Sequence, residues 1–269
     1  MKELAGRVAV VTGGGSGIGR GMAIAFVEAG MRVALADVEK SAAERVRDEL
    51  IANGAEAAAF PVDVSELDSL TALADAVYET FGATHLLCNN AGVSVFSPLH
   101  ATRDADWRWV LGVNLMGVVH GIQAFLPRMK AQAGEKHVVN TASIAGLVPF
   151  PALGPYVASK YAVVGLSETL RLEGASYGLS CSVLCPGNVR TQIVGSARNR
   201  PAQLGGPDAH VDPRWDDVIQ GGLDPLAVGR RVRAGVEANE LFILTHPELR
   251  EGVAERSAAL LAAFDDAGA

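Results

Sequence analysis

Seven short apolar runs recur along the 269-residue chain, separated by longer segments in which apolar residues repeat at helical spacing. The runs do not alternate polar with apolar residues, which indicates strands buried on both faces, as in a parallel sheet. Repeated strand–helix–strand units of this kind predict an α/β fold with a doubly wound, mainly parallel sheet. The seven runs are residues 8–11, 33–36, 57–60, 85–88, 137–140, 181–185 and 241–244.

The segments between the runs carry helix signals. In residues 65–81 apolar side chains recur at steps of three and four, Ser65 with Asp68 resembles an N-terminal cap, and Gly82 ends the pattern. Further helices are predicted at residues 38–53, at residues 156–177 and, packed against the body of the protein, at residues 247–264.

The chain is predicted to be one domain, residues 1–269, because no linker or low-complexity stretch divides it. The periodic patterns break down from 195 to 222, a stretch with three prolines and a pair of glycines. A long irregular insertion in a compact α/β domain is often a binding loop, so residues 193–222 are predicted to form a substrate lid. A surface excursion without a function is the alternative.

Composition excludes several classes of protein. With 49% hydrophobic and 20% charged residues the chain can bury a large core, which excludes disorder. A formal net charge of −7 gives no electrostatic basis for binding nucleic acid. Residues 109–127 hold no formal charge, but Asn114, His120 and three glycines suit an interior or interface helix better than a lipid bilayer.

The N-terminus lacks the layout of a signal peptide, and the three cysteines, Cys88, Cys181 and Cys185, lack CxxC spacing. So sparse and odd a count argues against a disulfide scaffold or a zinc site. Cys181 and Cys185 fall on one predicted strand, too far apart for a bridge. We therefore expect buried, reduced cysteines, no metal site, no membrane span and a cytoplasmic location.

A glycine-rich run joins the first predicted strand to a helical pattern. Its Gly13, Gly17 and Gly19 follow the spacing GxxxGxG, whereas GxGxxG would need a glycine at Arg20. Glycines let the backbone turn tightly and let a diphosphate approach the free amides at a helix N-terminus. This strand–turn–helix context therefore predicts a dinucleotide-binding loop.

Two aspartates follow the next two predicted strands. Asp37 lies about 20 residues past the glycines, where a carboxylate accepts hydrogen bonds from the adenosine ribose and repels a 2′-phosphate. NAD is therefore preferred over NADP, although Arg20, Arg32 or Lys40 could offset the carboxylate. Asp37 could instead cap the next helix, and Asp63 could hold the adenine amino group or cap a turn.

A tyrosine, a lysine and a serine form a candidate catalytic group. Tyr156 and Lys160 are four residues apart, which places both on one face of a helix. A neighbouring ammonium stabilises the phenolate, so Tyr156 could exchange a proton near neutral pH. Ser143 follows the fifth strand, where its hydroxyl could polarise a substrate oxygen in the crevice of the sheet.

Taken in order, these motifs resemble those of the short-chain dehydrogenase/reductase family. The matching positions are residues 12–19, the Asn-Asn-Ala-Gly of residues 89–92, Asn114, Ser143, Tyr156 with Lys160, and Pro186 with Gly187. The resemblance covers about residues 5–195. It implies a Rossmann fold with a seven-stranded sheet, and NAD(P)-dependent oxidation of alcohols or reduction of carbonyls.

The resemblance also implies a role for each motif residue. Tyr156 would be the acid/base and Ser143 the partner of the substrate oxygen, while Lys160 would lower the tyrosine's pKa and bind the nicotinamide ribose. Asn114 would hold a water in a relay from Lys160 to solvent; an amide bonded to backbone is the alternative. The expected cofactor-binding residues are Gly13, Ser16, Gly17, Ile18, Gly19, Asp37, Asp63, Val64, Asn90, Ala91, Gly92, Tyr156, Lys160, Pro186, Gly187, Val189 and Thr191, and the expected substrate-binding residues are Ser143 and Tyr156.

The predicted function is NAD-dependent hydride transfer between a secondary alcohol and its ketone. Apolar residues 144–153 favour a hydrophobic substrate, unless they pack against the lid or a neighbouring subunit. The alternatives are an NADPH-dependent carbonyl or 3-oxoacyl reductase, and a non-catalytic NAD(P)-sensing protein. Family members commonly pair through two long helices, here near residues 107–130 and 156–177, which implies a homodimer or homotetramer.

Overall fold

All seven predicted apolar runs form strands of one parallel sheet. In the computed structural model, which describes residues 1–266, the strand order is β3-β2-β1-β4-β5-β6-β7 and every neighbouring pair is parallel. The predicted doubly wound fold, with a sheet of seven strands, is confirmed. The strands are β1 (Val8–Thr12), β2 (Arg32–Asp37), β3 (Ala57–Pro61), β4 (Leu86–Asn89), β5 (Lys136–Thr141), β6 (Leu179–Cys185) and β7 (Phe242–Leu244).

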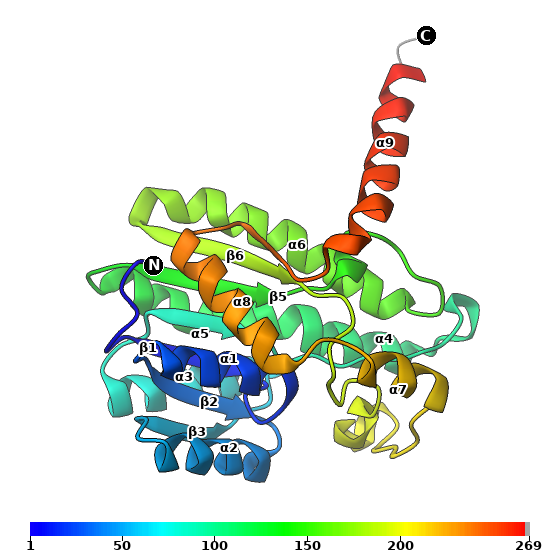
Figure 1. Ribbon diagram of the computed structural model, residues 1–269. Helices are drawn as coiled ribbons and strands as arrows, with labels where there is room; N and C mark the ends of the chain where they lie inside the picture. Colours follow the sequence, from blue (N-terminus) through cyan, green and yellow to red (C-terminus); the bar gives the residue numbers. More distant parts are fainter. Residues whose placement is uncertain (267–269) are drawn as a thin grey trace.

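Helices cover both faces of the sheet (Figure 1). Along β1, Val8 and Val10 pack into the core on one face, while Ala9 and Val11 pack into the core on the other. This burial on both faces explains why the strand sequences do not alternate. One face is covered by α1 (Gly17–Glu28), α2 (Lys40–Ala52) and α8 (Pro225–Ala238), and the other by α3 (Leu67–Phe81), α4 (Asp104–Leu111), α5 (Gly117–Ala131) and α6 (Gly154–Gly174).

The strand order places the functional motifs together. The chain moves from β1 outward to β3, and then returns to the other side of β1 with β4. At such a switch point the loops that follow the two strands diverge and leave a crevice at their carboxyl ends, where open α/β sheets bind ligands. The glycine run after β1 and the Asn-Asn-Ala-Gly segment after β4 flank this crevice.

The structure corrects the predicted start of the helix at residues 65–81. Ser65 does not cap it: the Ser65 hydroxyl donates to Asp63 Oδ1 at 2.7 Å, and α3 begins at Leu67. The Ser65 hydroxyl is therefore bonded to Asp63 and does not cap the backbone N–H groups at the start of α3. Such local side-chain bonds commonly compete with helix capping. The predicted end is right, because Gly82 follows α3 with a left-handed φ of 77°.

The predicted packing of the C-terminal helix is wrong. Helix α9 (Arg250–Asp266) forms, but it projects away from the body, as its red ribbon shows in Figure 1. Its apolar residues Leu260, Leu261 and Phe264 are 54%, 65% and 71% exposed. Only the base of the helix contacts the body, where the Arg256 guanidinium lies 5.0 Å from the centre of the Tyr161 ring.

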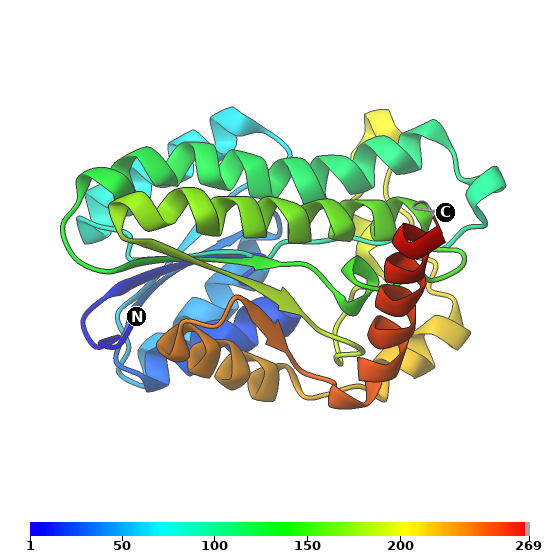
Figure 2. The ribbon, with the colours of Figure 1, turned by 90° about the horizontal axis from the view of Figure 1, so that it is seen from above.

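The long uncharged stretch forms two helices joined by one wider turn. A π-helical turn, Gly112–Met116, separates α4 from α5 and carries Asn114. By length and composition Asp104–Ala131 could cross a membrane. In this fold Val118, Phe125 and Met129 pack into the core, while α4 and the π-turn lie beside α6 (Figure 2). A core helix of a soluble protein has the same composition, so this stretch is weak evidence for a span.

A buried histidine in β5 makes stability depend on pH. His137 Nε2 lies 2.7 Å from the Ser182 hydroxyl, which itself donates to Glu240 O, so Nε2 carries the proton and Nδ1 does not. Within the described residues Nδ1 is buried without a partner. Burial lowers the pKa of His137 from 6.5 to about 3. The unfolded chain therefore binds more protons than the folded one between these values.

We therefore expect the free energy of unfolding to fall as the pH drops from about 6.5 toward about 3. The loss from this one group at pH 5 is about 2 kcal/mol, and its stabilising effect is complete above pH 6.5. Denaturant titrations at pH 7 and pH 5 measure it, with His137→Gln as the test and the exposed His100→Gln as control. An unchanged pH dependence in His137→Gln would contradict the assignment.

Candidate active site

The glycine run forms a tight turn against the segment after β4. Gly13 and Gly17 adopt positive φ values of 66° and 49°, which favour glycine. A Cβ on Gly19 would lie 2.0 Å from the carbonyl oxygen of Gly13, and one on Gly13 would lie 3.0 Å from Ala91 Cα. The turn thus leaves its amides at the α1 N-terminus open to a phosphate, as a dinucleotide requires.

Thr12 joins this turn to the neighbouring loop. Its hydroxyl oxygen accepts hydrogen bonds from the backbone N–H groups of Asn90 and Ala91, at 2.9 and 3.1 Å. The Asn90 side chain in turn donates to Thr12 O at 3.0 Å and accepts from Thr141 Oγ1 at 3.2 Å. The ends of β1, β4 and β5 are therefore held in register around the crevice.

Asp37 organises the backbone beside the glycine turn. Its Oδ2 accepts from Gly15 N and its Oδ1 accepts from Glu39 N, both at 2.9 Å. Burial raises the pKa of Asp37, and these two hydrogen bonds oppose the rise. The bond to Glu39, which precedes α2, agrees in part with a capping role. Asp63 bonds both the N–H and the hydroxyl of Ser65, which agrees with its turn-capping interpretation.

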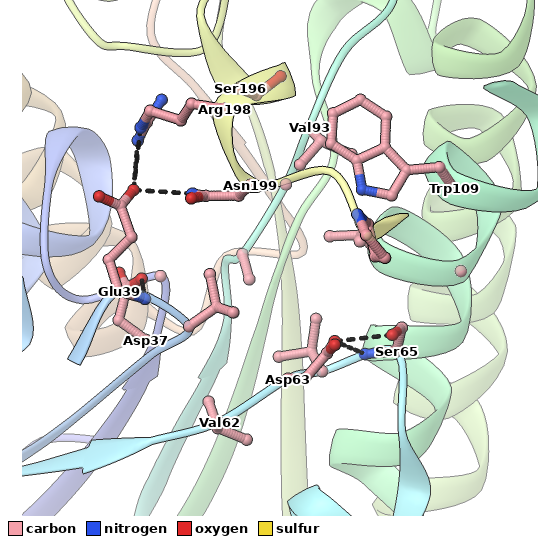
Figure 3. Close-up of a pocket in the computed structure, with 18 of the residues that line it drawn as sticks. Asp37, Glu39, Val62, Asp63, Ser65, Val93, Trp109, Ser196, Arg198 and Asn199 are labelled. Atoms are coloured by element: carbon pink, nitrogen blue, oxygen red, sulfur yellow. Dashed lines mark hydrogen bonds and ion pairs between the residues drawn. The ribbon is translucent and has the colours of Figure 1, made fainter. Parts of the chain in front are cut away.

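Many of the predicted cofactor residues line one cavity (Figure 3). It runs between the glycine turn, the ends of β2 and β3, the loop after β4 and the segment after Thr191. Val189 is buried in the core. The predicted cofactor residues that do not line the cavity are Gly17, Gly19, Tyr156, Lys160, Pro186, Gly187 and Val189. The predicted residues that line the cavity are Gly13, Ser16, Ile18, Asp37, Asp63, Val64, Asn90, Ala91, Gly92 and Thr191.

The predicted catalytic group is assembled at the carboxyl end of β5. Ser143 follows β5, accepts from Ala145 N at 3.1 Å and donates to Pro186 O at 3.4 Å. Tyr156 and Lys160 project from α6 on one face, with Lys160 Nζ 5.4 Å from the centre of the tyrosine ring. The Ser143 hydroxyl lies close enough to Tyr156 to affect the pKa of the phenol. The three side chains, distant in sequence, therefore share one site.

Burial dominates the acid–base properties of this group. Burial raises the pKa of Tyr156, and the nearby Ser143 hydroxyl opposes the rise. Burial also lowers the pKa of Lys160 to about 8, while its Nζ donates to Thr141 O at 2.8 Å. In the protein without its cofactor, burial therefore opposes the ionisation of Tyr156. A further positive charge in the crevice is needed to lower its pKa.

Asn114 is buried in the π-turn and bonded to the backbone. Its Oδ1 accepts from Val93 N at 2.8 Å, and its Nδ2 donates to Val93 O at 3.0 Å and to Ser159 Oγ at 3.2 Å. These are the bonds of the structural alternative. Asn114 Oδ1 and Lys160 Nζ both lie near Gly92, at 3.5 and 3.6 Å from where its Cβ would stand. Their closeness is compatible with a water relay between Asn114 and Lys160, which remains a prediction.

The loop after β6 is held by a histidine that no motif in the sequence indicates. Gly187 N donates to His246 Nδ1 at 3.0 Å, and His246 Nε2 donates to Asn188 O at 3.1 Å. The imidazole packs so closely that a Cβ on Gly187 would lie 2.7 Å from it. Since His246 follows β7, about 60 residues later in the chain, only the fold shows this contact.

The predicted lid contains short helices and lies over the cavity. Within it are η5 (Ser196–Asn199), η6 (Ala202–Leu204) and α7 (Pro213–Gln220), where the sequence predicted irregular structure. Arg200 is buried and pairs with Asp106 of α4 at 2.6 Å. Burial alone would raise the pKa of Asp106. Hydrogen bonds from Arg103 and Arg200 outweigh this effect and lower the pKa to about 2. This ion pair fixes the lid to α4 beside the cavity.

Comparison with known proteins relates the chain to one family. Residues 7–202 match the family model of the short chain dehydrogenases. A C alpha-dehydrogenase of Sphingobium sp. is 36% identical over 97% of this chain and 87% of its own, and a cyclohexanol dehydrogenase of Acinetobacter sp. is 37% identical over 70% and 75%. A short-chain dehydrogenase/reductase from Burkholderia phymatum, solved in complex with NAD, superimposes with a TM-score of 0.92 at 40% identity, over 97% of this chain and 96% of that one.

The chain therefore belongs to the short-chain dehydrogenase/reductase family, and it is an oxidoreductase of that family.

Proposed function

We propose that the protein is an NAD-dependent dehydrogenase of hydrophobic secondary alcohols, acting reversibly on the corresponding ketones. The observation that carries the proposal is the Ser143–Tyr156–Lys160 group, whose Lys160 Nζ lies 3.6 Å from where a Cβ on Gly92 would stand. Gly92 lines the cavity together with Gly13 of the glycine turn and Asp37. This arrangement brings a proton-transfer group beside a place for a dinucleotide, which is what alcohol oxidation requires.

Each catalytic side chain has one task at the substrate oxygen. A bound nicotinamide supplies the hydride acceptor and, when oxidised, a positive charge. Ser143 donates a hydrogen bond to the substrate oxygen and orients it toward Tyr156. Tyr156 Oη takes the hydroxyl proton during oxidation and returns it during reduction. Lys160 stabilises the phenolate through the low-dielectric interior, and Asn114 would hold water next to it.

Asp37 supports NAD as the cofactor. Its carboxylate lines the cavity at the end of β2, where it would accept hydrogen bonds from ribose hydroxyls and repel a 2′-phosphate. The three cations that could offset it are each paired with a carboxylate: Arg20 with Glu49, Arg32 with Glu56, and Lys40 with Glu44. The NAD complex of the Burkholderia relative supports the same choice.

Apolar and aromatic side chains support a hydrophobic substrate. The ring of Phe96, after β4, stacks on that of Trp215 in the lid with 4.7 Å between their centres. Leu147 and Val148, in the segment between Ser143 and Tyr156, are only half-buried. A relative that oxidises cyclohexanol, by its name, favours a cyclic alcohol. The alternative is an NADPH-dependent carbonyl or 3-oxoacyl reductase.

The test is a screen for NADH formation with secondary alcohols graded by size and polarity. We expect kcat/KM to rise from 2-propanol to cyclohexanol and to aryl alcohols, by at least about tenfold, because each added buried CH₂ contributes about 0.8 kcal/mol. NADP should be the poorer cofactor. A strong preference for NADPH, or turnover confined to 3-oxoacyl thioesters, would favour the alternative.

The predicted homo-oligomer and cytoplasmic location remain proposals. Leu172 on α6 is 79% exposed and Met116 in the π-turn is 40% exposed, on the two neighbouring helical segments expected to pair. Exposed apolar side chains on such helices suit a subunit interface. Sedimentation equilibrium gives the subunit number.

A further inference from the structure

An arginine of the lid pairs with a glutamate in the part of the cavity that Asp37 lines. Arg198 Nε and Nη2 donate to Glu39 Oε1 at 3.0 and 2.6 Å, and Asn199 Nδ2 donates to the same oxygen at 2.7 Å. Figure 3 shows the two lid side chains reaching Glu39 across the mouth of the cavity. Burial alone would raise the pKa of Glu39, but the hydrogen bonds from Asn199 and Arg198 outweigh this effect and lower the pKa.

Among the described residues, Arg198 donates hydrogen bonds to three acceptor residues: Glu39, Gln192 and Gly195. Its remaining nitrogen, Nη1, donates to the carbonyl oxygens of Gln192 and Gly195, at 3.3 and 3.0 Å. The guanidinium therefore has a fixed orientation, with each nitrogen bonded to an acceptor of the protein. A planar guanidinium oriented in this way offers the forked geometry that a phosphate group binds best, once its present acceptor is removed.

Glu39 stands two residues from the carboxylate that the proposed function places at the adenosine ribose. Its own N–H donates to Asp37 Oδ1, and Asp37, Glu39, Arg198 and Asn199 all line the same cavity. Arg198 is near enough to Asp37 to lower the pKa of that carboxyl. If the adenosine ribose binds at Asp37, its 2′-phosphate would lie near the Arg198 guanidinium. The guanidinium would bind this phosphate if it were not already bonded to Glu39.

We propose that Glu39 is a second determinant of cofactor choice, which excludes NADP by engaging Arg198 of the lid. Asp37 repels a 2′-phosphate directly, whereas Glu39 removes the cation that could compensate. The proposal rests on the proposed function, since it assumes that the adenosine ribose binds at Asp37. It adds a role for two residues, one in the loop before α2 and one in the lid.

The experiment measures the Kd of NADH and of NADPH by fluorescence in the absence of substrate. In Glu39→Ala the freed guanidinium should pair with the 2′-phosphate, so we expect the Kd of NADPH to fall by about tenfold, the range of one charge-assisted pair. The Kd of NADH should stay the same or rise, because the lid loses its bonds to Glu39. The double variant Glu39→Ala/Arg198→Met should lose the gain in NADPH affinity.

Glu28 provides a matched control. It makes a two-pronged pair with Arg230 between α1 and α8, at 3.0 and 2.6 Å, and its side chain is 34% exposed, as is that of Glu39. Glu28→Ala should leave both Kd values within twofold. If Glu39→Ala lowers the melting temperature strongly, Glu39→Gln keeps the shape and removes the charge, and it should show a smaller shift in the same direction.

The outcomes separate this proposal from the proposed function. An unchanged NADPH affinity in both Glu39 variants, or a gain that persists without Arg198, would overturn the role of Glu39. Failure of the wild-type protein to bind either dinucleotide would instead overturn the proposed function itself.

Discussion

Replacing Tyr156 by phenylalanine is expected to lower kcat by about a thousandfold, within the range of 10² to 10⁴ that a general acid–base contributes. The change removes only the hydroxyl that meets Ser143, and leaves the ring beside Lys160, 5.4 Å from its Nζ. Without the hydroxyl no side chain at that point can take the alcohol proton. Steady-state oxidation of the best alcohol from the screen, with saturating NAD, measures the loss.

The affinity for NADH should survive this substitution within about twofold, since the phenolic oxygen makes a small part of the cofactor contacts. The melting temperature should also be preserved, because phenylalanine fills the same space. A variant with near-normal kcat would show that another group moves the proton. A variant that no longer binds NADH would instead show that Tyr156 acts mainly in cofactor binding and not in proton transfer.

Replacing Gly19 by alanine is expected to weaken NADH binding by about a hundredfold or more, since amide contacts to a diphosphate are charge-assisted and several are lost together. The new Cβ would lie 2.0 Å from Gly13 O and 2.8 Å from Asn90 Nδ2, neither of which can yield without moving the turn. Both atoms belong to the turn and the adjoining loop that Thr12 holds together. Isothermal titration with NADH measures the affinity.

Gly165 is the matched control for that substitution. It lies on the exposed face of α6, and a Cβ there meets no atom within 4 Å. Gly165→Ala should leave the NADH affinity unchanged and stabilise the fold by about 0.5–1 kcal/mol, the helix preference of alanine over glycine. Equal binding by both variants would mean that the turn after β1 does not hold the diphosphate.

The strands and the motif residues could be predicted from the sequence because their signals are local. Burial on both faces gives an apolar run without alternation, and the need for positive φ gives glycine at Gly13 and Gly17. The group around Tyr156 was predictable for a similar reason, since a four-residue spacing on a helix defines one face. These features depend on neighbours in the chain and little on the rest of the fold.

The remaining features depend on contacts between distant segments. The bond that Gly187 N donates to His246 and the bond that Arg198 donates to Glu39 join residues about 60 and 159 positions apart. No local pattern indicates either contact. The burial of Tyr156, which opposes its ionisation, is likewise a property of the assembled site. The packing of α9 was misjudged because apolar spacing does not reveal whether a surface exists to receive it.

The contact between His246 and Gly187 also has a consequence for how the protein matures during translation. A ribosome releases the chain in the direction from β1 to β7, so the glycine turn leaves the exit tunnel well before β7 and the imidazole that follows it. The loop after β6 stays without its anchor until then. A nascent chain arrested before β7 should therefore hold its coenzyme poorly, even with most of the sheet already formed.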